Sequence, residues 1–147
     1  MNSDSEEDKV SLSLRIWHPT LSVDEINSGL GLKLKYFQSI GAGKITITGR
    51  VVEGVYEKSY LWAILEEKCA SRLDHVVENW CTSLELLESR LVHIVESGGE
   101  MTLSVTIVSN DMYDFYLPKS LLDRVSSLGL GLEFSLYAGD KAMDQPP

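Results

Sequence analysis

The stretch that decides the fold spans residues 71–99 and reads SRLDHVVENWCTSLELLESRLVHIVESGG. Its apolar residues recur mostly at steps of three or four, the spacing that places side chains on one face of an α-helix. Gly98 and Gly99 supply the stop, because glycine readily adopts the left-handed conformation of a helix end. We therefore expect one helix about 40 Å long, at about 1.5 Å per residue. Its buried face would consist of Leu73, Val76, Val77, Trp80, Leu84, Leu87, Leu91, Ile94 and Val95.

The segments on both sides of this helix alternate between apolar and polar residues, as half-buried strands do. Residues 10–17 and 101–107 show the clearest alternation, and residues 130–136 form a last strand. A short helix follows the first strand, with Ser22 and Glu25 spaced as a capping box. Another short helix precedes the last strand. Because each strand keeps one polar face, helices are expected to cover only one face of the sheet.

These elements predict an α+β fold in two layers. A mainly antiparallel sheet carries one long central helix and two short helices on one face, ferredoxin-like in character. The order strand, short helix and Gly-Leu-Gly-Leu occurs in residues 10–32 and again in residues 101–132. This similarity indicates either two β-α half repeats or a chance resemblance between the two segments. We expect a disordered acidic tail at residues 1–9, a single domain at residues 10–137 and a flexible tail at residues 138–147.

Composition excludes several classes of function. The chain has 147 residues and a formal net charge of −9, and an acidic protein repels phosphate backbones, so we expect no nucleic-acid partner. Apolar runs are far shorter than the roughly 20 residues that cross a membrane. Residues 1–9 do not resemble a secretory signal. Cys69 and Cys81 lie on or beside the long helix and would be about 18 Å apart, which is too far for a disulfide. We therefore expect a cytoplasmic protein, and nothing in the composition sets its oligomeric state.

Few residues suggest catalysis or metal binding. His18 stands at a strand end, where a histidine can act as a base or ligand or can simply bond the local backbone. His75 and His93 would share a helix face but lie about 27 Å apart, so they cannot share a metal. The chain has no zinc-binding spacing and no nucleophile motif. We expect neither a metal nor another cofactor.

Aromatic residues on or near the strands are the more informative feature. If several lie on the uncovered face of the sheet, they form a contact surface for a protein or a flat ligand; otherwise they belong to the core. A loop that combines acidic and aromatic residues follows the strand at 101–107. The candidate residues for ligand or partner contact are Arg15, Trp17, His18, Trp62, Asp111, Tyr113, Asp114 and Tyr116.

The opening of the chain reads SLSLRIWHP at residues 11–19 and LSVDEI at residues 21–26. Together with a Tyr-Leu-Trp strand at residues 60–62 and a Glu-Ser-Gly-Gly helix end at residues 96–99, it resembles the bacterial family called domain of unknown function 4279. The resemblance covers residues 10–137 and implies no established activity. Small acidic domains of this kind often accompany toxins as immunity proteins, and that association suggests a similar role here.

We therefore expect a non-enzymatic protein-interaction module, immunity-like or inhibitor-like, that masks a basic partner. The alternative is a small-molecule-binding domain or an unrecognised enzyme with a pocket around His18, Arg15 and Trp62. A third interpretation is a structural component of a larger assembly.

Overall fold

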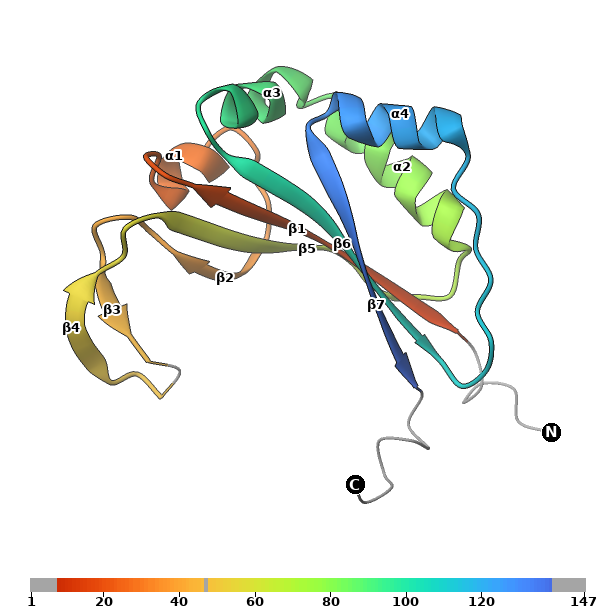
Figure 1. Cartoon of the computed structure of the whole chain (residues 1–147), viewed down its shortest axis with the longest axis horizontal. Helices are drawn as coiled ribbons and strands as arrows, with labels where there is room; N and C mark the ends of the chain where they lie inside the picture. Colours follow the sequence, from red (N-terminus) through yellow and green to blue (C-terminus); the bar gives the residue numbers. More distant parts are fainter. Residues whose placement is uncertain (1–7, 47, 139–147) are drawn as a thin grey trace.

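The computed structural model describes residues 8–46 and 48–138, in which a sheet carries helices on one face (Figure 1). Residues 1–7 and 139–147, where the two tails were expected, lie outside the described residues. The elements follow one another as β1 (Lys9–His18), α1 (Val23–Asn27), β2 (Leu34–Gln38), β3 (Gly43–Ile45), β4 (Val51–Val55), β5 (Ser59–Cys69), α2 (Leu73–Glu85), α3 (Glu88–Glu96), β6 (Glu100–Ser109), α4 (Lys119–Ser127) and β7 (Leu130–Ala138).

The main sheet has the strand order β2-β5-β1-β6-β7, and β3 and β4 form a separate hairpin at its end (Figure 1). The central strand β1 runs antiparallel to both neighbours, β2 is antiparallel to β5, and β6 and β7 are parallel. The fold is therefore α+β with a mainly antiparallel sheet, as predicted. The two β-α units differ in sheet order, because β5 lies between β1 and β2 whereas β6 and β7 are adjacent.

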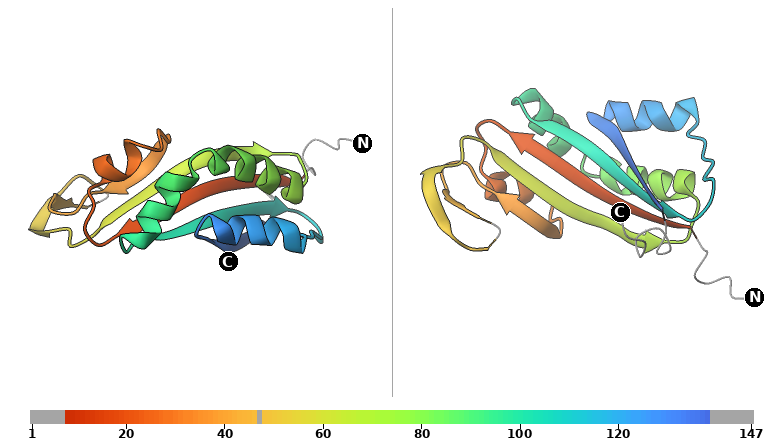
Figure 2. Two further views of the ribbon diagram at one scale, coloured as in Figure 1. Left: turned by 90° about the horizontal axis from the view of Figure 1, so that it is seen from above. Right: turned by 60° about the horizontal axis from the view of Figure 1, so that its bottom comes forward.

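In the described residues, the helices α1, α2, α3 and α4 all lie on the same side of the sheet, as the view from above in Figure 2 shows. The alternation along β1 and β6 explains this arrangement, since every second side chain is apolar and sits beneath the helices. None of the helices in the described residues is long and apolar enough to cross a membrane. The buried core beneath them includes Val10, Leu12, Leu14, Ile16, Met101, Leu103, Val105 and Ile107.

The single long helix predicted for residues 71–97 is wrong. The chain forms two helices, α2 and α3, separated at Leu86 and Leu87, where Leu87 leaves the helical region with φ −109° and ψ 16°. A sheet twists along its width, so one straight rod of about 40 Å would lose contact with it. The break lets α2 pack on β1 and α4 while α3 packs on β6, and it keeps both Leu84 and Leu91 buried. Neither glycine nor proline marks this break in the sequence.

The predicted helix ends are confirmed. The Ser22 hydroxyl oxygen accepts a hydrogen bond from the backbone N–H of Glu25 at 3.1 Å and donates one to the Glu25 carboxylate at 3.1 Å. Gly98 has a φ of +108°, and the N–H of Gly99 bonds to the carbonyl of Ile94 at 2.8 Å. The Ser22 cap thus begins the short helix α1, and Gly98 and Gly99 end the helix α3, where the sequence indicated.

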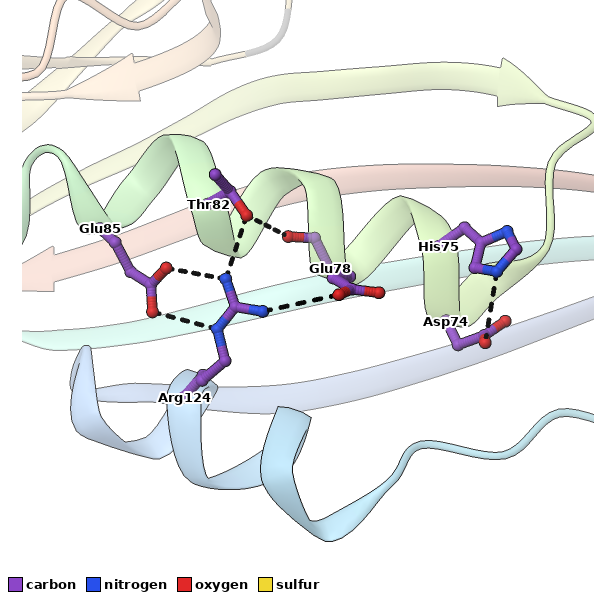
Figure 3. A network of polar contacts seen from close by, with 6 residues as sticks. All are labelled: Asp74, His75, Glu78, Thr82, Glu85 and Arg124. Atoms are coloured by element: carbon purple, nitrogen blue, oxygen red, sulfur yellow. Dashed lines mark hydrogen bonds and ion pairs between the residues drawn. The ribbon is translucent and has the colours of Figure 1, made fainter.

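An exposed ion-pair network joins α4 to α2 on the outer side of the helical layer (Figure 3). The Arg124 guanidinium donates to both oxygens of Glu85, at 2.7 and 3.1 Å, and to the Thr82 hydroxyl at 3.0 Å. It also lies 3.9 Å from Glu78. Hydrogen bonding from Arg124 lowers the pKa of Glu85. Arg124 of α4 thus pairs with two carboxylates of α2, Glu78 and Glu85.

Candidate binding site on the uncovered face of the sheet

The face of the sheet opposite the helices is polar and aromatic. The alternation along β1 places Arg15 and Trp17 on this face, and residues paired across antiparallel strands point the same way. Arg15 pairs with Trp62 on β5, and Trp17 pairs with Tyr60. The right-hand view of Figure 2 brings this side of the sheet forward. Three of the predicted contact residues, Arg15, Trp17 and Trp62, therefore share one surface.

An aromatic row crosses three strands of this face, formed by Trp17, Tyr60 and Tyr36. The ring centroids of Trp17 and Tyr60 lie 4.2 Å apart, and those of Tyr36 and Tyr60 lie 6.0 Å apart. Trp17 and Tyr36 remain 39% and 46% exposed, and the Lys58 ammonium lies 5.3 Å from the Trp17 ring. Exposed aromatic side chains held by their neighbours offer a large contact area with little loss of conformational freedom.

Next to this row, the Trp62 ring is contacted by two cations. The Arg15 guanidinium carbon lies 4.7 Å from the ring centroid, and the Lys35 ammonium lies 4.4 Å from it. They approach from the strands on either side of β5. Lys35 reaches the ring because β2 is irregular between Leu34 and Tyr36, and such a bulge redirects side chains. Cation–π attraction holds both charges beside the indole.

A hollow of about 520 Å³ adjoins this cluster, and we call it the Arg15 hollow. A volume of this size is typical of sites for small ligands. The hollow lies where β1 and β5 are out of regular register between Val10 and Ser13, and where the Lys68 N–H donates to the Ser11 hydroxyl at 3.0 Å. Its lining consists of Ser11, Leu12, Ser13, Arg15, Lys35, Trp62, Ile64, Glu66, Glu67, Lys68, Thr106, Ser135 and Tyr137.

Tyr60 belongs to the aromatic row and also lies near two charged groups, the Arg15 guanidinium and the Glu133 carboxylate. Burial raises the pKa of its phenol, the nearby Glu133 carboxylate adds to this rise, and the Arg15 guanidinium opposes it. Glu133 accepts a hydrogen bond from the Ser104 hydroxyl at 3.0 Å. The phenol is therefore neutral near pH 7 and can donate or accept a hydrogen bond.

His18 is not part of this face. It lies on the helix side of β1 and is completely inaccessible to solvent. Its Nδ1 accepts hydrogen bonds from the backbone N–H groups of Thr20 and Leu21, at 3.1 and 2.9 Å, and its Nε2 bonds to the Ser97 hydroxyl at 2.9 Å. Burial lowers the pKa of His18, and the nearby His93 lowers it further. The structure therefore does not bring His18 together with Arg15 and Trp62 in one pocket.

The acidic-aromatic loop is also separate from the Arg15 hollow. Asp111, Tyr113, Asp114 and Tyr116 lie in the irregular segment between β6 and α4. Tyr113 packs against the core, whereas the other three are exposed. Tyr113, Asp114 and Tyr116 border a depression at the start of α2, together with Arg72, Leu73, Asp74 and Phe115. The predicted contact residues thus fall into three places in the fold.

Metal ligands do not gather in the part of the chain that the structure describes. No group of three His, Cys, Asp or Glu residues is placed there so that it could hold a metal ion. The hollow on the uncovered face offers hydroxyl groups, aromatic rings, the cations Arg15, Lys35 and Lys68, and the carboxylates Glu66 and Glu67.

Sequence reasoning missed Lys35 and the hydroxyl groups of the hollow. The alternation in the sequence identified the polar positions of two strands, including Ser11 and Ser13 of β1 and Thr106 of β6. Their register, which places Ser11 opposite Thr106, was not visible. Lys35 carried no signal, because its position depends on the irregular pairing of a strand without clear alternation.

The structure is that of a small α+β protein in which the described helices leave one face of the sheet uncovered. The family described as Domain of unknown function (DUF4279) matches residues 8–139, and the chain belongs to this family. The resemblance inferred from the opening motif is therefore confirmed. No curated protein and no solved structure matches the chain.

Proposed function

We propose that this protein is a non-enzymatic binding module and that the uncovered face of its sheet is the contact surface for a protein partner. The observation that carries the proposal is the aromatic row beside the Arg15–Trp62 pair. Tryptophan, tyrosine and arginine are the residues that most often dominate binding energy at protein interfaces. Here they lie on β1, β5 and the edge strand β2, on a face that none of the helices in the described residues covers.

Binding is favoured over catalysis by the state of His18, the strongest acid–base candidate in the sequence. Both of its ring nitrogens are engaged and its ring is inaccessible. A general base must reach the proton that it removes, so this histidine serves the fold. The alternative function, a small-molecule-binding domain, rests on the Arg15 hollow and would use the same face.

The charge of the face bears on the kind of partner. Arg15, Lys35 and Lys58 all lie beside its aromatic rings, so the partner region that meets them is expected to be acidic. A basic partner, as expected from the net charge of −9, would instead meet the helical side. There Glu78 and Glu85 already pair with Arg124 (Figure 3). An immunity-like or inhibitor-like role is one form of this proposal.

The proposal is tested with two matched variants of the full chain. Trp17→Ser and Leu122→Ser each remove a large apolar side chain of similar exposure, 39% and 41%, from the uncovered face and from α4 respectively. A partner captured from the native host is purified, and its affinity for each variant is measured. We expect Trp17→Ser to weaken binding about tenfold or more and Leu122→Ser to change it by less than about twofold. The reverse order would refute the proposal.

A further inference from the structure

The Arg15 hollow contains a charge without a counterion. Arg15 is half-buried, and among the described residues no carboxylate lies within 4.0 Å of it. Its Nε and the indole Nε1 of Trp62 are both inaccessible and lack a hydrogen-bond partner. A partly desolvated cation without a counterion is costly. It is also unusual in a chain with 22 acidic and 13 basic residues, where acceptors are plentiful.

The guanidinium of Arg15 is held in place before any ligand arrives. Trp62 contacts it on one side at 4.7 Å, and the same ring contacts the Lys35 ammonium at 4.4 Å. An arginine that stacks on an aromatic ring keeps its plane fixed while its outer N–H groups remain able to donate. Such a planar pair of donors matches the two oxygens of a carboxylate.

The rest of the lining selects among anions. Hydroxyl groups of Ser13, Thr106 and Ser135 line the hollow and can donate further hydrogen bonds to an oxyanion. Glu66 and Glu67 stand in the same lining and oppose a group of high negative charge. Lys68 also lines the hollow, so three cations, Arg15, Lys35 and Lys68, stand against these two carboxylates. A formal net charge of +1 favours a single, planar negative charge over a phosphate dianion.

We propose that the Arg15 hollow binds a carboxylate group, presented either by an acidic side chain of a partner or by a free organic acid. The first source rests on the proposed function, whereas the second does not require a protein partner. Ile64 and Tyr137 add apolar surface to the lining, so the group that carries the carboxylate is expected to be partly apolar. The Arg15 guanidinium provides the principal contact, and the hydroxyl groups fix the orientation.

The test uses the full chain and nuclear magnetic resonance of side-chain N–H groups. The probes are benzoate, N-acetylglutamate amide and inorganic phosphate, each at the same ionic strength as a chloride control. The signals observed are the Nε–H of Arg15 and the indole N–H of Trp62. The Nε–H of Arg124 serves as an internal control, because it lies on α4, outside the hollow, and donates to Glu85 at 3.1 Å. We expect both carboxylates to shift the first two signals saturably, with dissociation constants on the order of 1 mM.

Two variants that each remove one cation from the uncovered face complete the design. Arg15→Gln is expected to weaken carboxylate binding about tenfold or more, the effect of losing a charge-assisted hydrogen bond. Lys58→Gln removes a cation that lies beside Trp17 and outside the hollow, and it is expected to change binding less than about twofold. Urea unfolding of both variants verifies that they fold.

The outcomes separate the possibilities. Tighter binding of N-acetylglutamate amide than of benzoate identifies an acidic side chain as the source, and the reverse order identifies a free organic acid. Absence of saturable shifts, tighter binding of phosphate, or equal losses in Arg15→Gln and Lys58→Gln would each overturn the proposal. None of these results alters the partner affinities measured with Trp17→Ser, because Trp17 lies outside the hollow, so the two proposals fail independently.

Discussion

Replacing His18 with alanine should destabilise the protein severely, because this buried ring organises the turn after β1. The ring makes three hydrogen bonds of 3.1 Å or less, two through Nδ1 to backbone N–H groups and one through Nε2 to Ser97. At about 1 kcal/mol for each bond, and about 1 kcal/mol more for the vacated space, the loss is about 4 kcal/mol. His18→Asn keeps an acceptor near the position of Nδ1 and should lose only about 2 kcal/mol.

The assay is equilibrium urea unfolding at about pH 7.5, where the imidazole is neutral. With a slope of about 2 kcal/mol per M, the unfolding midpoint should fall by about 2 M for the alanine variant and by about 1 M for the asparagine variant. Equal losses in the two variants would mean that the Nδ1 acceptor contributes nothing. A loss below about 0.5 kcal/mol for alanine would refute the structural role of the ring altogether.

Three further predictions concern stability and thiol reactivity. Because the pKa of His18 in the native protein is below its ordinary value of 6.5, the unfolded chain binds this proton more readily than the native protein does. The contribution of His18 to stability is therefore complete above pH 6.5 and is lost as the pH falls below 6.5. Below pH 6.5, the free energy of unfolding should decline by up to about 1.4 kcal/mol per pH unit more in the wild type than in His18→Asn. Gly99→Ala would place a methyl group 2.7 Å from the α3 backbone and should cost more than about 2 kcal/mol in urea unfolding, whereas Gly131→Ala meets nothing closer than 3.8 Å and should be nearly neutral. Burial raises the pKa of the Cys81 thiol, so a disulfide reagent should modify the half-buried Cys69 in the native protein and Cys81 only after unfolding; rapid modification of both thiols would contradict this.

The centre of the sheet could be predicted from the sequence because alternation is a local property. The pattern at residues 10–17 identified β1 and that at residues 101–107 identified β6, and both are confirmed. The same alternation could have placed His18 correctly. Alternate residues of a strand point to the same face, so His18 shares the parity of Leu14 and Ile16 and its side chain points towards the helices with theirs. The interpretation of His18 as a strand-end residue that bonds the local backbone is confirmed, because its Nδ1 accepts hydrogen bonds from the N–H groups of Thr20 and Leu21. Its place among the candidate contact residues ignored this parity.

The parts that could not be predicted depend on pairing between distant segments. The adjacency of β1 and β5 brings Arg15 to Trp62, which are 47 residues apart, and no local pattern specifies that register. Lys35 joins them through an irregularity in β2. The break at Leu87 follows from the twist of a sheet whose strand order was unknown, so an unbroken apolar stripe was read as one helix.

The most direct test of the central claim is site-specific photo-cross-linking in the native host. A benzophenone side chain is introduced at Thr102, which pairs with Arg15 on the uncovered face, and in a second variant at Ser89, which is exposed on α3. We predict that Thr102 cross-links to a protein partner and that Ser89 does not. Cross-linking of that partner from Ser89 alone, or equally from both positions, would contradict the assignment of the uncovered face as the contact surface.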